Sequence, residues 1–186
     1  FDEKVTIDEA GITLNGPNAG KPGHGDRNYE ATIKQGAVIT ADSVTVDGLE
    51  VTNDDTNGIL LGTTAVPSNV VVTNTVVRDV GGGTAGSKAV GNGINLQFNG
   101  VFKQTSSGVE ITNNLITGIS TPDAANGDAD AIGVQLLPRG NDVQNLLVKD
   151  NVIRDIQPGT AGGRSEARAV SIATQFTDTS GGTRGD

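Results

Sequence analysis

The sequence predicts an all-β chain that folds as a parallel β-solenoid, and three observations lead to this fold class. Short apolar segments recur along the chain, each segment alternates apolar and polar residues, and glycine, asparagine or aspartate separates the segments. Alternation with a period of two residues is typical of a strand with one buried face, and no stretch shows the sustained period of a helix. Strands this short do not bury their apolar faces alone, so successive repeats are expected to stack at about 4.8 Å.

Two kinds of segment recur in chain order. The first kind contains an apolar pair, a small polar residue and a second apolar pair, and it occurs at 44–51, 70–77, 109–116 and 146–153. The second kind is a shorter apolar strand that follows each of the first, at 58–61, 93–96, 131–134 and 169–172. The period corresponds to a coil of roughly 20 to 25 residues plus insertions of variable length.

The repeats predict which residues stack on one another. One column lies in the interior, because a slip by one residue would bury the polar residue that follows each member. Its members are Val46, Val72, Ile111 and Val148. A second column lies at the bend between two strands, where a left-handed backbone and hydrogen bonds along the stack are expected. Its members are Gly48, Asn74, Asn113 and Asp150. A narrow interior of stacked β-branched residues also explains why aromatic residues make up only 3% of the chain.

The pattern V-x-I-x-x-N-x-I, followed by a loop and G-I-x-L, resembles a known repeat. It is similar to the right-handed parallel β-helix repeat (PbH1) of pectate-lyase-like proteins, over about residues 40 to 175. The leading segment 5–20, with Arg27 and 30–33, resembles the first coils of secreted or surface-anchored β-helix proteins of bacteria and archaea. The resemblance implies a single-stranded right-handed parallel β-helix with loop insertions. It selects no function, because this scaffold carries lyases, epimerases, hydrolases, adhesins and proteins without known activity.

Residues 1–186 are expected to form one β-helix domain within a longer solenoid. Residues 1–40 supply the first coils, 41–175 the repeats, and 176–186 a loop toward a further coil. An open solenoid end exposes unpaired strand edges, so end-to-end self-association is expected unless a cap or a neighbouring domain covers them.

The composition excludes several classes of function. Thirteen Lys and Arg against 22 Asp and Glu leave a net charge of −9, which disfavours nucleic acid and anionic membranes as partners. The chain has no cysteine and one histidine, so disulfides, thiolate zinc sites and multi-histidine metal centres are excluded. No apolar run approaches about 18 residues and no signal peptide is recognisable, so no membrane insertion of this segment is expected.

Insertions recur just before the second kind of strand, at 52–57, 79–92, 117–130 and 154–168. Stacked coils would gather these loops along one edge of the solenoid. The loops carry most of the chemically active side chains: Asp54, Asp55, Lys88, Asp123, Asp128, Asp130, Arg164, Glu166 and Arg168. Three interpretations remain open for this cluster, namely a glycan-binding groove, a calcium site made of hard oxygen ligands, and ordinary solvated loops.

The resemblance also implies candidate catalytic residues. Related enzymes that cleave uronate polymers by β-elimination use an Arg or Lys base and a cation or acid beside the substrate carboxylate. The candidates for these roles are Arg168, Asp130, Arg164 and Lys88. The repeat alignment puts Asn57, Asn92, Asp130 and Arg168 in one column at the start of the second kind of strand. It therefore predicts that Asp130 and Arg168 pair, either structurally or as part of a site.

No cofactor is required, and calcium is the metal that the loops suggest. Its candidate ligands are Asp123, Asp128, Asp130, Asp54 and Asp55. The alignment also predicts two neutral outward columns without a base. They are Leu60, Asn95, Gly133 and Ser171, and then Gly62, Gln97, Gln135 and Ala173. The candidate ligand-binding residues are Asn95, Gln97, Gln135 and, from the loops, Glu166.

Two functions from different classes fit these features. The first is an extracellular, non-catalytic β-helix module that serves at the cell surface as a structural, adhesive or glycan-contacting unit, with polysaccharide or other surface proteins as partners. The alternative is a polysaccharide lyase or epimerase that acts on uronate-containing glycans. Neutral strand columns and scarce aromatic residues favour the module, whereas the clustered loops favour the enzyme. A location outside the cell is expected from the resemblance, and the absence of cysteine is consistent with it.

Overall fold

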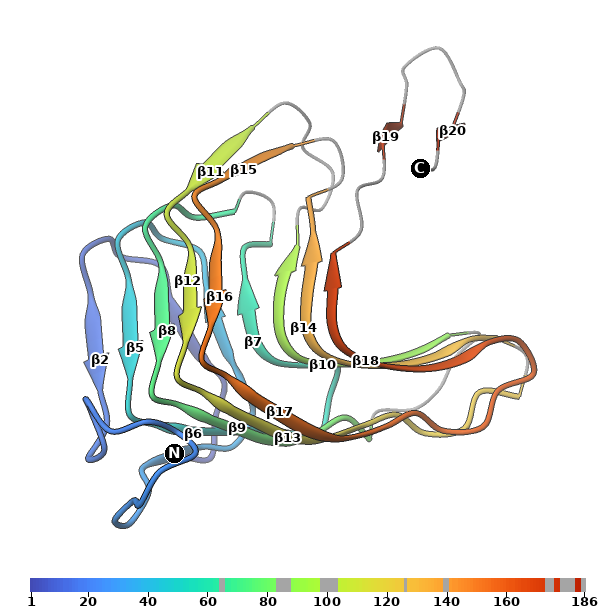
Figure 1. The fold of residues 1–186 in the computed structure, drawn as a ribbon, viewed down its shortest axis with the longest axis horizontal. Coiled ribbons are helices and arrows are strands. Elements are labelled where there is room, and N and C mark those ends of the chain that lie inside the picture. Colours follow the sequence, from blue (N-terminus) through green and yellow to red (C-terminus); the bar gives the residue numbers. More distant parts are fainter. Residues whose placement is uncertain are drawn as a thin grey trace.

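The computed structural model describes residues 1–63, 66–82, 88–97, 104–125, 127–138 and 141–172, and the backbone of 176–177 and 183–184. Parallel strands stack into a β-solenoid of about four turns (Figure 1). The predicted all-β, parallel-solenoid class is therefore confirmed. Over these described ranges there is no helix, and so none that is long and apolar enough to cross a membrane.

Three parallel sheets form the walls of the solenoid. The first sheet contains, in spatial order, β1 (Val5–Ile7), β4 (Ala37–Ile39), β7 (Asn57–Leu61), β10 (Ala89–Gln97), β14 (Ala129–Leu137) and β18 (Ser165–Ile172). The second contains β2 (Thr13–Asn15), β5 (Thr45–Asp47), β8 (Val71–Thr73), β12 (Glu110–Thr112) and β16 (Leu147–Lys149). The third contains β3 (Thr32–Ile33), β6 (Glu50–Asn53), β9 (Val76–Val80), β13 (Leu115–Ser120) and β17 (Val152–Gln157).

Two short pairs complete the described strands. In the first, β11 (Thr105–Ser107) is parallel to β15 (Asp142–Gln144). In the second, β19 (Phe176–Thr177) is antiparallel to β20 (Thr183–Arg184), within the segment expected to lead toward a further coil. The remaining residues of that segment lie outside the described part of the chain.

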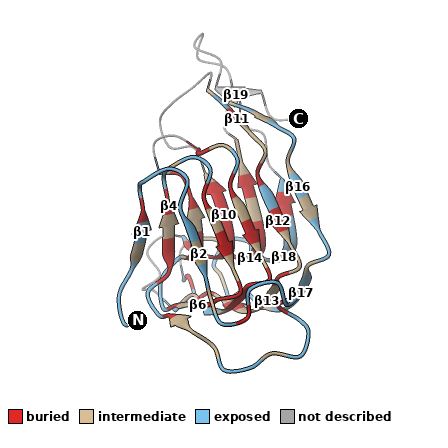
Figure 2. Ribbon diagram, turned by 90° about the vertical axis from the view of Figure 1, so that its left-hand side faces the viewer, coloured by how far each residue is buried: buried red, intermediate tan, exposed pale blue. Residues whose placement is uncertain are grey.

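The interior column predicted from the repeats is confirmed. Val46 lies opposite Val72, Val72 opposite Ile111, and Ile111 opposite Val148. The first three of these side chains are at most 1% exposed. Figure 2 shows that burial is greatest in the central strands, such as β10 and β14, and decreases toward β16 and β17. The apolar core is thus a continuous stack that runs along the solenoid axis.

The turn between the second and third sheets has the predicted left-handed bend. The bend residues have φ values of 73°, 53°, 57° and 55° at Gly48, Asn74, Asn113 and Asp150. A hydrogen bond runs along the stack from Asn74 Nδ2 to Asp47 Oδ1 in the preceding coil, at 2.8 Å. The predicted left-handed backbone is therefore present in all four members, and a side-chain hydrogen bond along the stack is present at Asn74.

An amide ladder lies one residue further along the same turn, where the sequence did not predict it. Asn114 Nδ2 donates to Asn151 Oδ1 at 3.0 Å and to the carbonyl oxygen of Val72 at 2.9 Å. Asn114 Oδ1 accepts the backbone N–H of Thr75 at 2.9 Å. Since Asn114 is fully buried, it joins three successive coils in a site from which water is excluded.

Residues 16–31 form a strap over this turn. The backbone N–H of Gly23 donates to the carbonyl oxygen of Asn113 at 2.7 Å. Arg27, with a side chain only 8% exposed, lies 2.6 Å from Glu30 Oε1. It also donates to the carbonyl oxygens of Asn74 at 2.6 Å and Leu49 at 3.3 Å. The Arg27 guanidinium thus fastens the strap to two coils.

Arg27→Ala is expected to lower the free energy of unfolding by about 3 kcal/mol, because it removes the cation from the largely buried Glu30 carboxylate and one donor each from the carbonyl oxygens of Asn74 and Leu49. Urea unfolding measures the loss. The matched control is Arg154→Ala, which removes a pair with Asp155 in which the side chains are 61% and 58% exposed. This change is expected to cost less than about 1 kcal/mol. Equal losses for the two variants would contradict the structural role of Arg27.

Glu50 is a nearly buried carboxylate on β6, 7% exposed. It accepts hydrogen bonds from Arg78 Nε at 2.7 Å and from Thr32 Oγ1 at 2.8 Å. Burial alone would raise the pKa of the Glu50 carboxyl, but the hydrogen bonds from Arg78 and Thr32 and the charges of Arg78 and Arg27 outweigh it. The pKa of Glu50 therefore lies below its ordinary value.

This pKa predicts a specific loss of stability in acid. A carboxyl with a folded-state pKa below its unfolded-state value of about 4.3 stabilises the fold above that pH, and the contribution is lost as the pH falls through the folded-state pKa. The free energy of unfolding of the wild type is thus expected to fall more steeply below about pH 4.3 than that of Glu50→Gln. Urea unfolding at a series of pH values checks this, and parallel curves for the two proteins would contradict it.

Candidate functional site

The insertion loops gather beside the first sheet. In Figure 1 the long strands β10, β14 and β18 run along an arm and then turn into the body of the solenoid. Two of the loops continue the stacking, since Ala124 forms a parallel bridge with Ala161 and the N–H of Ala129 donates to the carbonyl oxygen of Arg164 at 2.8 Å. Ala89, Ala124 and Ala129 form a small buried cluster of their own. The described residues of these two loops therefore stack on each other and share a small apolar cluster with Ala89.

Asp130 is the anionic centre of the arm. It is 4% exposed, and its Oδ2 lies 3.2 Å from Lys88 Nζ and 3.3 Å from Arg164 Nη2. Arg164 also places its Nε 2.9 Å from Glu166 Oε1. The four catalytic candidates do lie in one region, but each of the cations among them already has a carboxylate partner.

The predicted pair between Asp130 and Arg168 is wrong. Arg168 forms its ion pair with Glu166, two residues earlier on the same strand. In the register of the first sheet Asp130 lies opposite Glu166, whereas Arg168 lies opposite Ile132. The two charged residues are therefore not members of one column.

The error comes from the alignment of β14, which is displaced by two residues. The sequence alignment puts Ile132 in the column of Ile59 and Ile94, but the structure puts Val134 there. A shift of two residues keeps every side chain on its own face, so alternation alone does not detect it. The first outward column is consequently Leu60, Asn95, Gln135 and Ser171, with Gln97 opposite Leu137. Ala173, assigned to the second outward column, lies outside the described residues.

Glycine is the signal that determines the correct register. A Cβ atom on Gly93 would lie 2.6 Å from the carbonyl oxygen of Gly133 and 2.6 Å from Ile116 Cγ2. A Cβ atom on Gly58 would lie 2.6 Å from Val77 Cγ1. The third sheet fills this space in each coil, so the glycines at 58, 93 and 133 belong to one column.

The aspartates proposed as calcium ligands have other partners. Asp123 Oδ1 accepts the N–H of Thr160 at 2.7 Å, and hydrogen bonds from the side chain and backbone of Thr160 hold the pKa of Asp123 below its ordinary value. Asp128 Oδ1 accepts the N–H of Arg164 at 2.9 Å. That hydrogen bond, aided by the charges of Arg164 and Lys88 and opposed by desolvation, lowers the pKa of Asp128.

The candidate metal ligands do not converge. Within the described ranges, no group of three or more His, Asp or Glu side chains is placed so that it could hold a metal ion. Asp54 and Asp55 lie in the turn before β7, and the N–H of Asp55 donates to Asn53 Oδ1 at 3.1 Å. Calcium binding by these residues stays a prediction.

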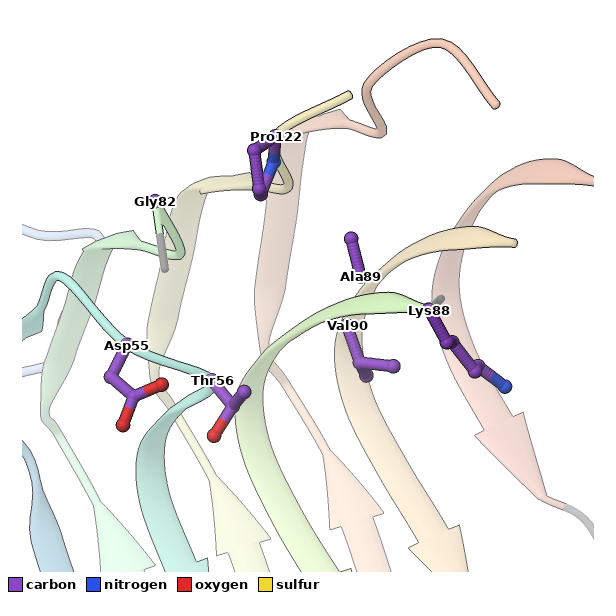
Figure 3. Close-up of a pocket in the computed structure, with 7 residues that line it drawn as sticks. All are labelled: Asp55, Thr56, Gly82, Lys88, Ala89, Val90 and Pro122. Carbon is purple, nitrogen blue, oxygen red and sulfur yellow. The ribbon is translucent and has the colours of Figure 1, made fainter. Parts of the chain in front are cut away.

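A first hollow, of about 320 Å³, lies at the base of the arm. Figure 3 shows its lining residues, which are Asp55, Thr56, Gly82, Lys88, Ala89, Val90 and Pro122. Asp55 and Thr56 come from the turn before β7, whereas Lys88 stands just before β10 and points away from Asp55 (Figure 3). This hollow therefore has one acidic and one basic side chain that do not face each other.

A second hollow, of about 280 Å³, adjoins the first and crosses β7, β10 and β14. We call it the amide groove, because amide side chains dominate its lining: Asn57, Asn92, Asn95, Gln97 and Gln135, with Thr56, Lys88, Val90, Asp130 and Leu137. Three of the four candidate ligand-binding residues thus lie together. The fourth, Glu166, is held by Arg164 and Arg168 and is absent from this lining.

Three asparagines form a cluster in the amide groove. Asn57 Oδ1 accepts hydrogen bonds from Asn92 Nδ2 at 3.0 Å and from Asn95 Nδ2 at 2.8 Å. Asn92 and Asn95 are 2% and 1% exposed. In the described part of the chain, their Oδ1 atoms are the two buried side-chain polar atoms without a hydrogen-bond partner. Buried polar atoms are normally paired, so these two require an explanation.

The repeats put Asn57 and Asn92 in one column, but nothing in the repeat pattern marks these two as ligand-binding residues. The signal that marks Asn92 is the segment G-N-G-I-N at 91–95, in which asparagines lie on both sides of a tightly packed glycine, and Asn57 likewise stands directly before Gly58. Glycine permits a tight bend in the strand, so that polar residues on its two sides can point to the same face of the sheet.

Comparison of the chain with protein-family models, with curated protein sequences and with solved structures finds no match. The class of the protein is accordingly defined by its fold. It is a parallel β-solenoid protein that carries an amide-lined groove beside an ordered loop arm.

Proposed function

We propose that this protein is an extracellular, non-catalytic β-helix module of the pectate-lyase-like kind, and that it contacts glycans at the cell surface through the amide groove. The observation that carries the proposal is the lining of the groove, where neutral amides from three neighbouring strands face a common hollow. Amide side chains both donate and accept hydrogen bonds, as the hydroxyl groups of a saccharide do.

The charges beside the groove support a binding role over a catalytic one. Cleavage of a uronate polymer by β-elimination requires a base within hydrogen-bond reach of the substrate and groups that neutralise its carboxylate. Arg164, Arg168 and Lys88 each lie in an ion pair with a carboxylate of the same chain. A substrate carboxylate would therefore have to compete with an intramolecular partner for each of these cations.

A polysaccharide lyase or epimerase acting on uronate-containing glycans is the second candidate. The observation that favours it is the position of Asp130 and Lys88, which line the amide groove together at its charged edge. In that case the substrate carboxylate would take the place of Asp130 beside Lys88 or Arg164.

Surface proteins and other copies of the chain are further proposed partners. Val170 and Ile172 on β18 are 42% and 68% exposed, and Leu147 on β16 is 40% exposed. Apolar side chains on the outer strands of a sheet favour pairing with another chain, which supports end-to-end self-association as part of the proposal.

The lyase assay separates the module from a lyase, which releases unsaturated uronates. The chain is expected to release no unsaturated uronate from alginate, pectate or a glycosaminoglycan, as measured by ultraviolet absorbance. Arg168→Ala is expected to change the free energy of unfolding by at most about 1 kcal/mol, as for a partly exposed ion pair. A rise in absorbance that disappears in Lys88→Ala or in Arg168→Ala would establish the enzyme instead. For the module, retention of the wild-type chain on at least one immobilised glycan is expected.

A further inference from the structure

The two unpaired oxygens of the amide groove are not required by the solenoid. Asn95 lies opposite Leu60 in the preceding coil, so an apolar side chain is accommodated at this place in the first sheet. An unpaired buried carbonyl destabilises a fold, whereas an apolar residue of similar size in its place would not. The unpaired oxygen of Asn95 thus opposes the stability of the protein at a position where the fold allows an apolar residue.

The two unpaired oxygen atoms indicate which chemical groups a ligand must bring to the groove. Both atoms are carbonyl oxygens, Asn92 Oδ1 and Asn95 Oδ1, so the missing groups are hydrogen-bond donors. The remaining amides of the lining, on Asn57, Gln97 and Gln135, offer both donors and acceptors. A hydroxyl group matches this mixture, because it donates one hydrogen bond and accepts others.

The charge balance at the rim of the groove excludes a strongly charged ligand. Lys88 Nζ lies 3.2 Å from Asp130 Oδ2, and the same oxygen lies 3.3 Å from Arg164 Nη2. An anionic ligand would have to displace Asp130 from its two cations. A cationic ligand would have to compete with those cations for one carboxylate. An uncharged ligand avoids both losses.

The shape of the groove suits an extended ligand. Its lining comes from three neighbouring strands, β7, β10 and β14, which in a sheet are about 4.8 Å apart. A ligand that lies across these strands, along the solenoid axis, meets amides from successive coils. Val90 and Leu137 supply apolar contacts for the carbon face of a sugar ring.

We infer that the amide groove binds an uncharged, hydroxyl-rich saccharide, with the side chains of Asn92 and Asn95 turning to accept its hydroxyl groups. The turn is needed because the two oxygens are buried, although their residues line the groove. Terminal amide torsions are broad, and the rotation exchanges the hydrogen bonds that the two amides donate to Asn57 Oδ1 for hydrogen bonds with the ligand. This inference rests on the proposed glycan-contacting function and names the chemistry of its ligand.

The first test is an NMR titration of the chain labelled with nitrogen-15. The probes are the neutral oligosaccharides cellohexaose, mannohexaose and maltohexaose, and the charged oligosaccharide trigalacturonate. At least one neutral hexaose is expected to shift the side-chain NH₂ resonances of Asn92 and Asn95 in a saturable way, and trigalacturonate to leave them in place. Resonances that none of the three hexaoses moves, or that trigalacturonate moves further than they do, would overturn the inference.

The second test uses Asn95→Leu and a matched control. Asn95→Leu is expected to raise the Tm, because it removes an unpaired buried carbonyl, and to weaken binding of the active hexaose at least about tenfold, which corresponds to about 1.4 kcal/mol. The control Gln144→Ala changes an exposed amide on β15, away from the groove, and is expected to bind as the wild type does. A lower Tm for Asn95→Leu would make Asn95 a structural residue and would overturn the inference, as would unchanged binding.

The two proposals fail in distinguishable ways. If the wild-type chain is retained on an immobilised glycan while the Asn92 and Asn95 resonances stay in place, this inference fails, and glycan contact stands only at a place other than these two asparagines. If no glycan retains the chain and no hexaose shifts these resonances, both fail.

Discussion

Ile111→Asp is expected to unfold the chain. Ile111 is fully buried in the interior column between Val72 and Val148. A carboxylate at this place would have no cation within the apolar core, and an unpaired buried charge costs several kcal/mol. Because a domain of this size has a total stability of only about 5–15 kcal/mol, loss of the folded state is expected. Circular dichroism and the dispersion of amide NMR signals measure it.

The neighbouring residue provides the control for this experiment. Thr112 follows Ile111 on β12 and faces outward, opposite Thr73 and Lys149. Thr112→Asp introduces the same carboxylate on the solvent side, beside a lysine, and is expected to change the free energy of unfolding by no more than about 0.5 kcal/mol. A folded Ile111→Asp, or an unfolded Thr112→Asp, would contradict the inward and outward assignment of this strand.

Asn114→Ala is expected to lower the free energy of unfolding by about 4 kcal/mol. The change leaves the buried N–H of Thr75 without a partner and removes the hydrogen bond from the amide to the carbonyl oxygen of Val72. Each unpaired buried group costs about 1–3 kcal/mol, and the lost bond to Asn151 and the vacated space add to this. Urea unfolding provides the measurement.

The matched control is Asn113→Gly, one residue earlier in the same turn. Asn113 has a φ of 57°, which glycine adopts without strain, and it lies at the bend rather than in the ladder. A loss of less than about 1 kcal/mol is expected. If Asn113→Gly were as damaging as Asn114→Ala, the stabilising amide would be the one at the bend, where the sequence predicts hydrogen bonds along the stack.

Much of the solenoid was predictable because its main determinants are local. The alternation around Val46, Val72 and Ile111 distinguishes the inside from the outside of each strand, and an asparagine or glycine marks each bend. The register of β14 was not predictable in the same way. Alternation repeats every two residues, so it does not distinguish Ile132 from Val134 as the residue opposite Ile94. The packing around Gly133 decides between them, and that packing involves residues distant in the sequence.

The residues of the candidate site were largely predictable, but their ion-pair and hydrogen-bond partners were not. Asn95, Gln97 and Gln135 were expected on the outer face and do line the amide groove. The partner of Asp130 depends on the register of β14, so the error in that strand also produced the wrong pairing with Arg168. The cluster around Asn57 depends on hydrogen bonds between neighbouring coils. The alternation of residues along a single strand does not predict such bonds.

Native mass spectrometry of the chain with the active neutral hexaose tests most directly the central claim, that the protein binds a glycan and does not cleave it. The account predicts a complex with the mass of the chain plus one intact hexaose, which persists on prolonged incubation and is lost in Asn95→Leu. Shortened saccharides that accumulate with the wild-type chain, or a complex that Asn95→Leu forms equally well, would contradict it.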